Sequence, residues 1–176
     1  MLKRLALAAL VTVLTPVWAS AHGPTRQKVV ETIEINAPAD KVWAIVGKFQ
    51  DMGWTGVFTK TEGKGDNAPD ATRTLTLPSG AKLDEKLNKY NDAGKSYAYE
   101  ITKVDVKDLP VANYSSTISV KGDGAKSTVE WKGAFYRGYA NNDPPPELSD
   151  EAAVKAVTGA YKAGLANLKK TLEAGG

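Results

Sequence analysis

Arg73 and Glu85 are the charged side chains whose types and spacing best suit the recognition of a bound molecule. They lie in two alternating segments, 72–77 and 82–91, which the turn residues Pro78-Ser79-Gly80 join as a hairpin. Pairing of the two segments is expected to place Arg73 and Glu85 diagonally across one face, among leucines. Two interpretations stay open: a structural ion pair that closes the sheet, or a pair that orients the polar head group of a ligand.

Aromatic side chains alternate along the later segments, at Tyr97, Tyr99, Tyr114, Trp131 and Phe135. Residues two apart on a strand face the same side, so these rings are expected to line one face of a sheet. Such a face is usually packed core. Buried tyrosine hydroxyls need hydrogen-bond partners, however, and some of them could serve a ligand.

Other residue types that carry catalysis are scarce. The chain has no cysteine and a single histidine, so neither a Ser-His-acid triad nor a site with several histidine ligands can be assembled. His22 would need further ligands to hold copper, and the spacing of Asp143, Glu147, Asp150 and Glu151 does not match an EF-hand loop. We therefore predict no catalytic residue, no metal and no cofactor.

A proline-rich segment, 141–147, precedes the last predicted helix. Three consecutive prolines hold the backbone near polyproline II, which makes the segment stiff before it meets any partner. Aromatic and arginine side chains, which interfaces favour, lie just before it. The predicted partner surface consists of Arg137, Tyr139, Pro144, Pro145 and Pro146. The alternative is that the prolines only set the angle at which the chain enters the helix.

The amino terminus has the pattern of a cleavable export signal. Lys3 and Arg4 precede an apolar run, 5–17, and Ala19-Ser20-Ala21 gives the small-x-small pattern of a cleavage site. The run is shorter than the roughly 20 residues that a membrane-spanning helix needs. We therefore expect a signal peptide at 1–21, a mature chain that begins at His22, a periplasmic location and no membrane anchor after cleavage.

Charge and composition exclude several classes of protein. Without Lys3 and Arg4, the 23 basic residues fall to 21 against 20 acidic ones, so the mature chain is almost neutral. No basic stripe with interleaved aromatic residues exists, which argues against a nucleic-acid partner. Without cysteine the chain cannot form a disulfide, and the about 155 residues left after cleavage suit one domain, 22–176.

The remaining patterns predict an α+β fold. One strand, 28–35, and one helix, 38–49, come first; further strands are predicted at 57–62, 72–77, 82–91, 95–103, 111–120 and 126–136. A final helix, 150–172, carries one apolar stripe, and Ser149 or Asp150 suits its N-cap. A helix with so much apolar surface needs a sheet to cover it, so we expect a curved antiparallel sheet of about seven strands wrapped around this helix.

Several motifs carry a resemblance to known proteins. They are APADKVW at 37–43, RTLTLPSG at 73–80, LDEKL at 83–87, LPVANY at 109–114 and AGLANLKK at 163–170. With this order of elements, the chain resembles the START-like helix-grip superfamily and, within it, the polyketide cyclase/dehydrase-like group. The export signal, HGPT at 22–25 and FYRGYANNDPPPELSDEAAVKAV at 135–157 are similar to the periplasmic MxaD family of methanol-oxidising bacteria.

This resemblance implies a function and a place for it. The superfamily implies an apolar cavity between sheet and helix, and its lining is predicted to include Arg73, Glu85, Tyr99, Tyr114 and Trp131. The MxaD family implies a non-catalytic accessory protein that assists the contact between methanol dehydrogenase and its cytochrome c acceptor. The alternative is a carrier of an apolar small molecule, or a cyclase-like enzyme that uses Arg73, Glu85 and a tyrosine in the cavity.

Overall fold

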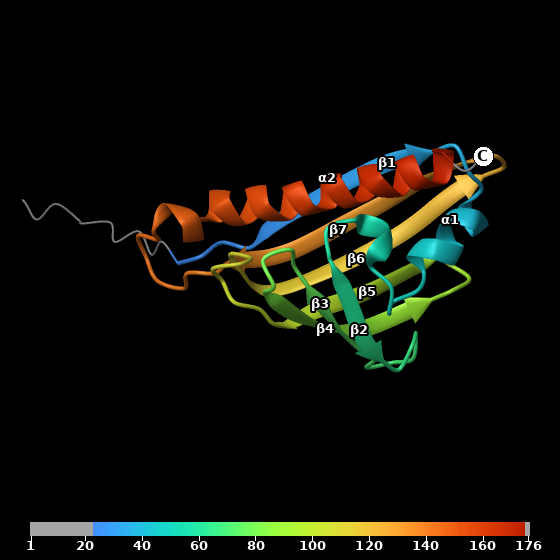
Figure 1. The fold of residues 1–176 in the computed structure, drawn as a ribbon. Helices are drawn as coiled ribbons and strands as arrows, with labels where there is room; N and C mark the ends of the chain where they lie inside the picture. The colour runs from blue at the N-terminus through green and yellow to red at the C-terminus, as the bar shows by residue number, and fades with distance from the viewer. Residues whose placement is uncertain (1–22, 175–176) are drawn as a thin grey trace, which may run out of the picture.

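Seven antiparallel strands form one curved sheet that holds a long carboxy-terminal helix in its concave face (Figure 1). The computed structural model describes residues 23–174. The elements, in chain order, are β1 (Gln27–Ile35), α1 (Ala39–Val46), η1 (Gly53–Thr55), β2 (Lys60–Lys64), β3 (Thr72–Thr76), β4 (Lys82–Asn91), β5 (Ser96–Lys103), β6 (Val111–Asp123), β7 (Lys126–Arg137), η2 (Pro146–Leu148) and α2 (Asp150–Ala174). The predicted signal peptide, 1–21, and His22 lie outside the described residues.

The sheet order is β1-β7-β6-β5-β4-β3-β2, so strands β2 to β7 form a meander and β1 joins its last strand. This confirms the predicted α+β helix-grip architecture, including the six-strand meander. Alternation explains the two faces. Along β7 every second residue from Ser127 to Arg137 is buried, and each residue between them is either half-buried or exposed. The buried set faces α2 and forms the core.

Two predicted boundaries are wrong, and both errors lie in the connection from α1 to β2. The helix ends at Val46, and not at Phe49, because the chain turns after Gly47 and the Asp51 amide bonds to the Lys48 carbonyl at 2.9 Å. The strand predicted at 57–62 begins only at Lys60. Gly56, in the left-handed region with φ 63°, reverses the chain there, so Val57 and Phe58 stay outside the sheet.

Helix α2 follows its predicted stripe closely. Its buried residues are Ala153, Val157, Tyr161, Gly164, Leu165, Leu168 and Leu172. Ser149 caps the helix, because its hydroxyl accepts a hydrogen bond from the Ala152 amide at 3.1 Å. Among residues 23–174, no helix is long and apolar enough to cross a membrane.

Candidate functional site

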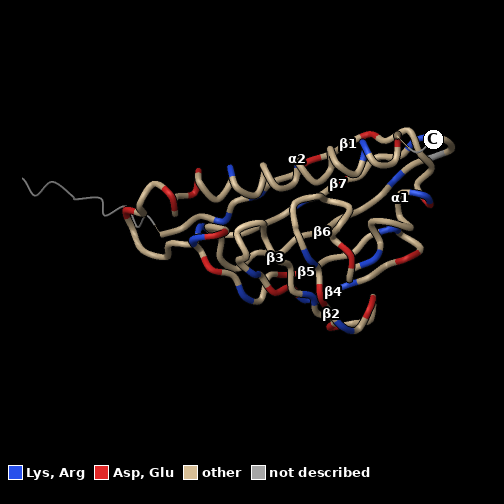
Figure 2. Tube along the Cα trace, viewed as in Figure 1, with Lys and Arg blue, Asp and Glu red and all other residues tan. Residues whose placement is uncertain are grey.

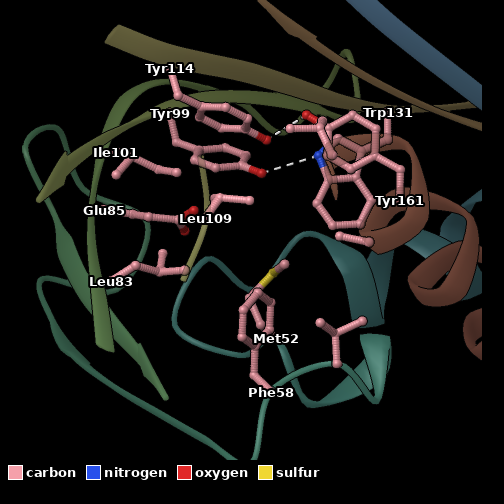
Figure 3. Close-up of a pocket in the computed structure, with 13 residues that line it drawn as sticks. Met52, Phe58, Leu83, Glu85, Tyr99, Ile101, Leu109, Tyr114, Trp131 and Tyr161 are labelled. Atoms are coloured by element: carbon pink, nitrogen blue, oxygen red, sulfur yellow. Dashed lines mark hydrogen bonds between the residues drawn. The ribbon is translucent and has the colours of Figure 1, made fainter. Parts of the chain in front are cut away.

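A small cavity lies between α2, the concave face of the sheet and the connection from α1 to β2 (Figure 3). Its lining is apolar apart from one carboxylate and a few hydroxyl and indole groups: Met52, Val57, Phe58, Leu83, Glu85, Tyr99, Ile101, Leu109, Tyr114, Trp131, Val157, Ala160 and Tyr161. The cavity volume is about 50 Å³, which is enough for a few water molecules. A drug-sized ligand needs several hundred cubic ångströms. The lining therefore has to move before a molecule of that size can enter.

Arg73 and Glu85 form an ion pair beside this cavity. They are directly opposite in the β3–β4 register, which corrects the predicted diagonal placement. The connecting loop decides the register: Gly80, with φ 86°, closes a turn that pairs Thr76 with Lys82. Arg73 Nε donates to Glu85 Oε2 at 2.6 Å, and the two residues are only 1% and 4% exposed. Glu85 lines the cavity, whereas Arg73 supports it from behind.

The Arg73 guanidinium also holds the connection that closes the cavity. Its Nη1 donates to the Phe49 carbonyl at 2.6 Å, and its centre lies 4.2 Å from the Phe49 ring and 4.9 Å from the Tyr99 ring. Nη2 is buried without a hydrogen-bond partner. One side chain therefore ties a cavity carboxylate to the segment that carries Met52 and Phe58.

Burial controls the protonation of this pair. Burial raises the pKa of Glu85, and the attraction of Arg73 offsets only part of that effect. For Arg73, burial disfavours the charged form, but the Glu85 carboxylate and the nearby tyrosines raise its pKa overall, so the guanidinium stays protonated. The site therefore combines a permanent cation with a carboxyl group whose proton is held more tightly than usual.

A directed chain of hydroxyl groups forms the inner wall. Ser116 donates to the Lys132 carbonyl at 2.8 Å and therefore accepts from Tyr161 at 2.9 Å. The Tyr161 hydroxyl in turn accepts from Tyr114 at 2.5 Å. Trp131 donates its indole N–H to Ser116 at 3.0 Å. The same N–H donates to the Tyr99 hydroxyl at 3.1 Å (Figure 3). Burial raises the pKa of Tyr99 and Tyr114 well above its ordinary value, so both groups stay protonated.

Tyr161, Ser116 and Gly133 were missed as site residues at the level of sequence. The helical period places Tyr161 on the apolar stripe of the final helix, which indicates core packing alone. In the structure its ring stacks on Trp131 with 4.2 Å between the ring centroids. Gly133 lets the helix approach, because a Cβ at that position would lie 2.4 Å from the Tyr161 hydroxyl oxygen. A glycine inside an alternating strand is the one signal that indicated a close approach.

Two polar atoms of the cavity remain available to a ligand. The Tyr99 hydroxyl accepts from Trp131, and among residues 23–174 its own proton has no acceptor. Glu85 accepts its hydrogen bond at Oε2, which leaves Oε1 without a donor from the described part of the chain. Figure 3 shows both groups on the same side of the cavity. Together they can donate to and accept from one small polar group, and a carboxyl–phenol pair can also transfer protons.

The predicted partner surface is only partly at the surface. Arg137 is 5% exposed, which corrects its placement there: its guanidinium donates to the carbonyls of Tyr139 and Asn141 at 2.9 Å and to Asp150 at 3.0 Å. Pro145 has polyproline II angles, φ −59° and ψ 149°, whereas Pro146 begins η2. Tyr139, Pro144 and Pro145 are half-buried and Pro146 is exposed. Arg137 therefore fastens this segment to the start of α2 from below.

Across residues 23–174, no three His, Cys, Asp or Glu side chains come together in a group that could hold an ion.

Comparisons with known proteins agree with this architecture. Residues 26–173 match the family described as polyketide cyclase / dehydrase and lipid transport. An uncharacterized protein from Bacillus thuringiensis is 30% identical with a TM-score of 0.70, and the alignment covers 83% of this chain and 98% of that one. The protein XoxI from Bacillus cereus is 31% identical with a TM-score of 0.69, covering 82% and 94%.

Norcoclaurine synthase from Thalictrum flavum, solved with dopamine and hydroxybenzaldehyde, is 17% identical with a TM-score of 0.61 and covers 93% of this chain and 96% of its own. At that identity the likeness shows the fold alone. No curated protein matches the chain. The family match over nearly all of the described residues, the two bacterial relatives and the helix-grip architecture show that this chain belongs to the polyketide cyclase/dehydrase and lipid transport family of the START-like superfamily.

Proposed function

We propose that this protein binds a small molecule in the cavity between α2 and the sheet, with Glu85 and Tyr99 recognising its polar group. The observation that carries the proposal is the pair of unused polar atoms, Glu85 Oε1 and the Tyr99 hydroxyl proton, in an otherwise apolar lining. Binding sites typically have a few placed polar groups in an apolar wall. The apolar part of the ligand would displace the connection that carries Met52 and Phe58.

The experiment is native mass spectrometry of protein purified from its own source, which detects a retained small molecule. Tyr99→Phe removes one hydroxyl and keeps the ring, so we expect the ligand to be lost. Tyr97→Phe is the matched control, because the Tyr97 hydroxyl is buried, has no hydrogen-bond partner and does not line the cavity. Absence of any retained molecule from the wild type, or equal retention by both variants, would contradict the proposal.

Enzymatic activity in the same cavity is the chemical extension of this proposal. Glu85 could serve as a general base or acid and Tyr99 as a hydrogen-bond donor, with Arg73 positioning the carboxylate. A cyclase-like reaction would then require turnover of the retained molecule. A Glu85→Gln variant that keeps the ligand and loses turnover would separate an enzyme from a carrier.

An accessory role in methanol oxidation is the second candidate. It rests on the resemblance of 135–157 to the MxaD family, and the exposed Asn141, Asn142 and Asp143 before the prolines support it as a contact region. In this role the protein would assist the contact of methanol dehydrogenase with cytochrome c from the periplasm, after removal of 1–21.

A test of the accessory role has to keep Arg137, because that side chain holds the proline-rich segment in place. Replacing Pro144-Pro145-Pro146 with Gly-Ser-Gly should weaken stimulation of methanol oxidation by the dehydrogenase and its cytochrome. Lys170→Gln, on the exposed side of α2, is the control. Unchanged stimulation by the folded triple variant would exclude this contact.

Sequencing the amino terminus of exported protein tests the predicted start of the mature chain at His22.

A further inference from the structure

A second hollow lies on the opposite, convex face of the sheet, and it differs from the cavity in size and chemistry. This convex trough has a volume of about 370 Å³ and crosses strands β1, β7, β6, β5 and β4. Its lining has two lysines, several hydroxyl-bearing or small residues and no acidic residue: Lys28, Val30, Asn88, Ala98, Tyr99, Ser115, Ser116, Thr117, Lys132, Gly133 and Ala134. The function proposed above does not use this face.

Three cations gather at the β1–β7 end of the convex trough. Lys28 pairs with Ala134 and Val30 pairs with Lys132 across the two strands, so the two lysines are diagonal neighbours on one face. Such neighbours are about 7–8 Å apart, within joint reach of one ligand group. Arg26 lies at the rim, where its Nη2 donates to Ser115 Oγ at 3.3 Å.

The positive charge of this cluster is largely uncompensated, because nearby acidic residues of the same face pair with other lysines. Glu34 pairs with Lys126 at 3.1 Å, and Glu100 pairs with Lys86 at 3.0 Å. Lys132 has one loose contact, 3.7 Å to Glu130, between two exposed side chains, and such contacts are worth little. Lys28 has no ion pair within the described part of the chain. Basic and acidic residues are interspersed along the chain (Figure 2), whereas the lining of the convex trough has two lysines and no acidic residue.

The floor of the convex trough consists of small side chains, some of which have hydroxyl groups that can form hydrogen bonds with a ligand. Ser115 and Thr117 of β6 have hydroxyl groups. The small side chains of Ala98 and Ala134 on the neighbouring strands leave space for a ligand. A register shift between Ala112 and Ser115 bends β6 just beside them. Val30, the exposed large hydrophobic residue of the described chain at 56%, forms one wall.

We propose that the convex trough binds an organic phosphate, with the phosphate group between Lys28, Lys132 and Arg26 and its polar body on the hydroxyl floor. A phosphate has nearly two negative charges and three acceptor oxygens, which suits several cations and hydroxyls converging on one point. The volume of about 370 Å³ accommodates a small organic body as well as the phosphate.

The test is an NMR titration of the ¹⁵N-labelled protein with glycerol 3-phosphate in 150 mM salt, which screens weak surface attraction. We expect shifts confined to the amides of β1, β5, β6 and β7 around the trough and a dissociation constant below about 1 mM. Lys28→Gln with Lys132→Gln should raise that constant about tenfold, because both ammonium groups are lost. Lys41→Gln with Lys170→Gln, which removes two exposed lysines elsewhere, should leave it unchanged.

A parallel arm uses vesicles of phosphatidylcholine with phosphatidylglycerol, to decide whether the phosphate is free or belongs to a lipid head group. Binding to either probe that the Lys28/Lys132 variant loses supports the proposal and identifies the source. Failure to bind both probes would overturn it. Shifts spread over lysines of the whole surface, or equal binding by the two double variants, would overturn it too.

Discussion

The two faces of the one sheet carry opposite kinds of site. On the concave face, the cavity is about 50 Å³, apolar and closed by helix α2, and its charges are buried in contact with each other. On the convex face, the trough is about 370 Å³ and open, its lining combines two lysines with hydroxyl and apolar groups, and both lysines are exposed. Both are built from the same strands, because successive residues of a strand point to opposite faces.

The two faces also differ in how many elements surround each side chain. A concave-face residue has neighbours from the sheet, from α2 and from the connection after α1, so each change there disturbs packing and hydrogen bonds together. A convex-face residue has neighbours mainly along its own strand and the next. Changes on the concave face should therefore cost folding stability as well as any binding there, while those on the convex face should change stability by at most about 1 kcal/mol.

The largest expected effect comes from breaking the buried ion pair. Glu85→Ala leaves the Arg73 guanidinium uncompensated, and we expect it to lower the free energy of unfolding by about 3–5 kcal/mol. Urea denaturation with an unchanged m-value measures this loss. Lys86→Ala, the next residue but on the convex face, breaks its 3.0 Å pair with Glu100 and should cost at most about 1 kcal/mol. Similar losses in the two variants would remove the contrast between the faces.

A smaller effect is expected from filling the gap that Gly133 leaves. Gly133→Ala places a methyl group 2.4 Å from the Tyr161 hydroxyl oxygen, and overpacking of this kind typically costs about 1–3 kcal/mol. Tyr161→Phe removes that oxygen, so the cost of Gly133→Ala should fall in the double variant; a double-mutant cycle measures the coupling. Ala134→Ser, at the adjacent convex position, should be nearly neutral. Strict additivity in the cycle would show that the two groups do not meet.

The contribution of Glu85 to the free energy of unfolding should decrease as the pH rises. Because the pKa of Glu85 is raised by burial, the folded protein holds this proton more tightly than the unfolded chain does. The contribution of Glu85 to stability is therefore full below its unfolded pKa of about 4.3 and is lost as the pH rises through the higher folded value. Unfolding free energies of the wild type, minus those of Glu85→Gln, should decrease as the pH rises from about 4 to 7. A constant difference would contradict the raised pKa.

The smallest effect on stability should come from the convex trough. Lys28→Gln with Lys132→Gln changes exposed side chains, so the free energy of unfolding should stay within about 0.5 kcal/mol of the wild type. Thermal and urea unfolding measure this directly. A loss of several kcal/mol would show that these lysines serve the fold, and the expected separation between the faces would fail.

Most of the fold could be predicted because its signals are local. Period-two alternation located β3 to β7 within a few residues, and the helical stripe located α2 with its Ser149 cap. The same alternation brought Arg73 and Glu85 onto one face. The alternation did not predict chain direction at two glycines with positive φ. The turn at Gly80 places Arg73 directly opposite Glu85, where a diagonal placement was expected, and the turn at Gly56 keeps Val57 and Phe58 out of β2.

The site could not be predicted in full, because its residues lie far apart in the sequence and local patterns do not show which of them are in contact. Tyr161 meets Ser116 and Tyr114 across 45 and 47 residues of chain, and Trp131 meets Tyr99 across 32. Arg137 was expected at the surface because it lies just before the proline-rich segment and interfaces favour arginine. It is buried instead, because the following segment folds back and its Asn141 carbonyl accepts a hydrogen bond from the guanidinium. Burial depends on which segments cover a residue, and that is a property of the assembled chain.

The sequence by itself determined the α+β class, the order of the elements and the composition of each sheet face, because periodicity and turn residues act over a few neighbouring residues. Only the tertiary structure decided that the interior closes to a small cavity, that hydroxyls from β6 and α2 form one directed chain, and that lysines of β1 and β7 lie beside one trough whose lining has no acidic residue. The physical reason is that strand register and helix docking are set by many long-range contacts at once, so the distances between side chains of different strands exist only after the sheet has closed around α2.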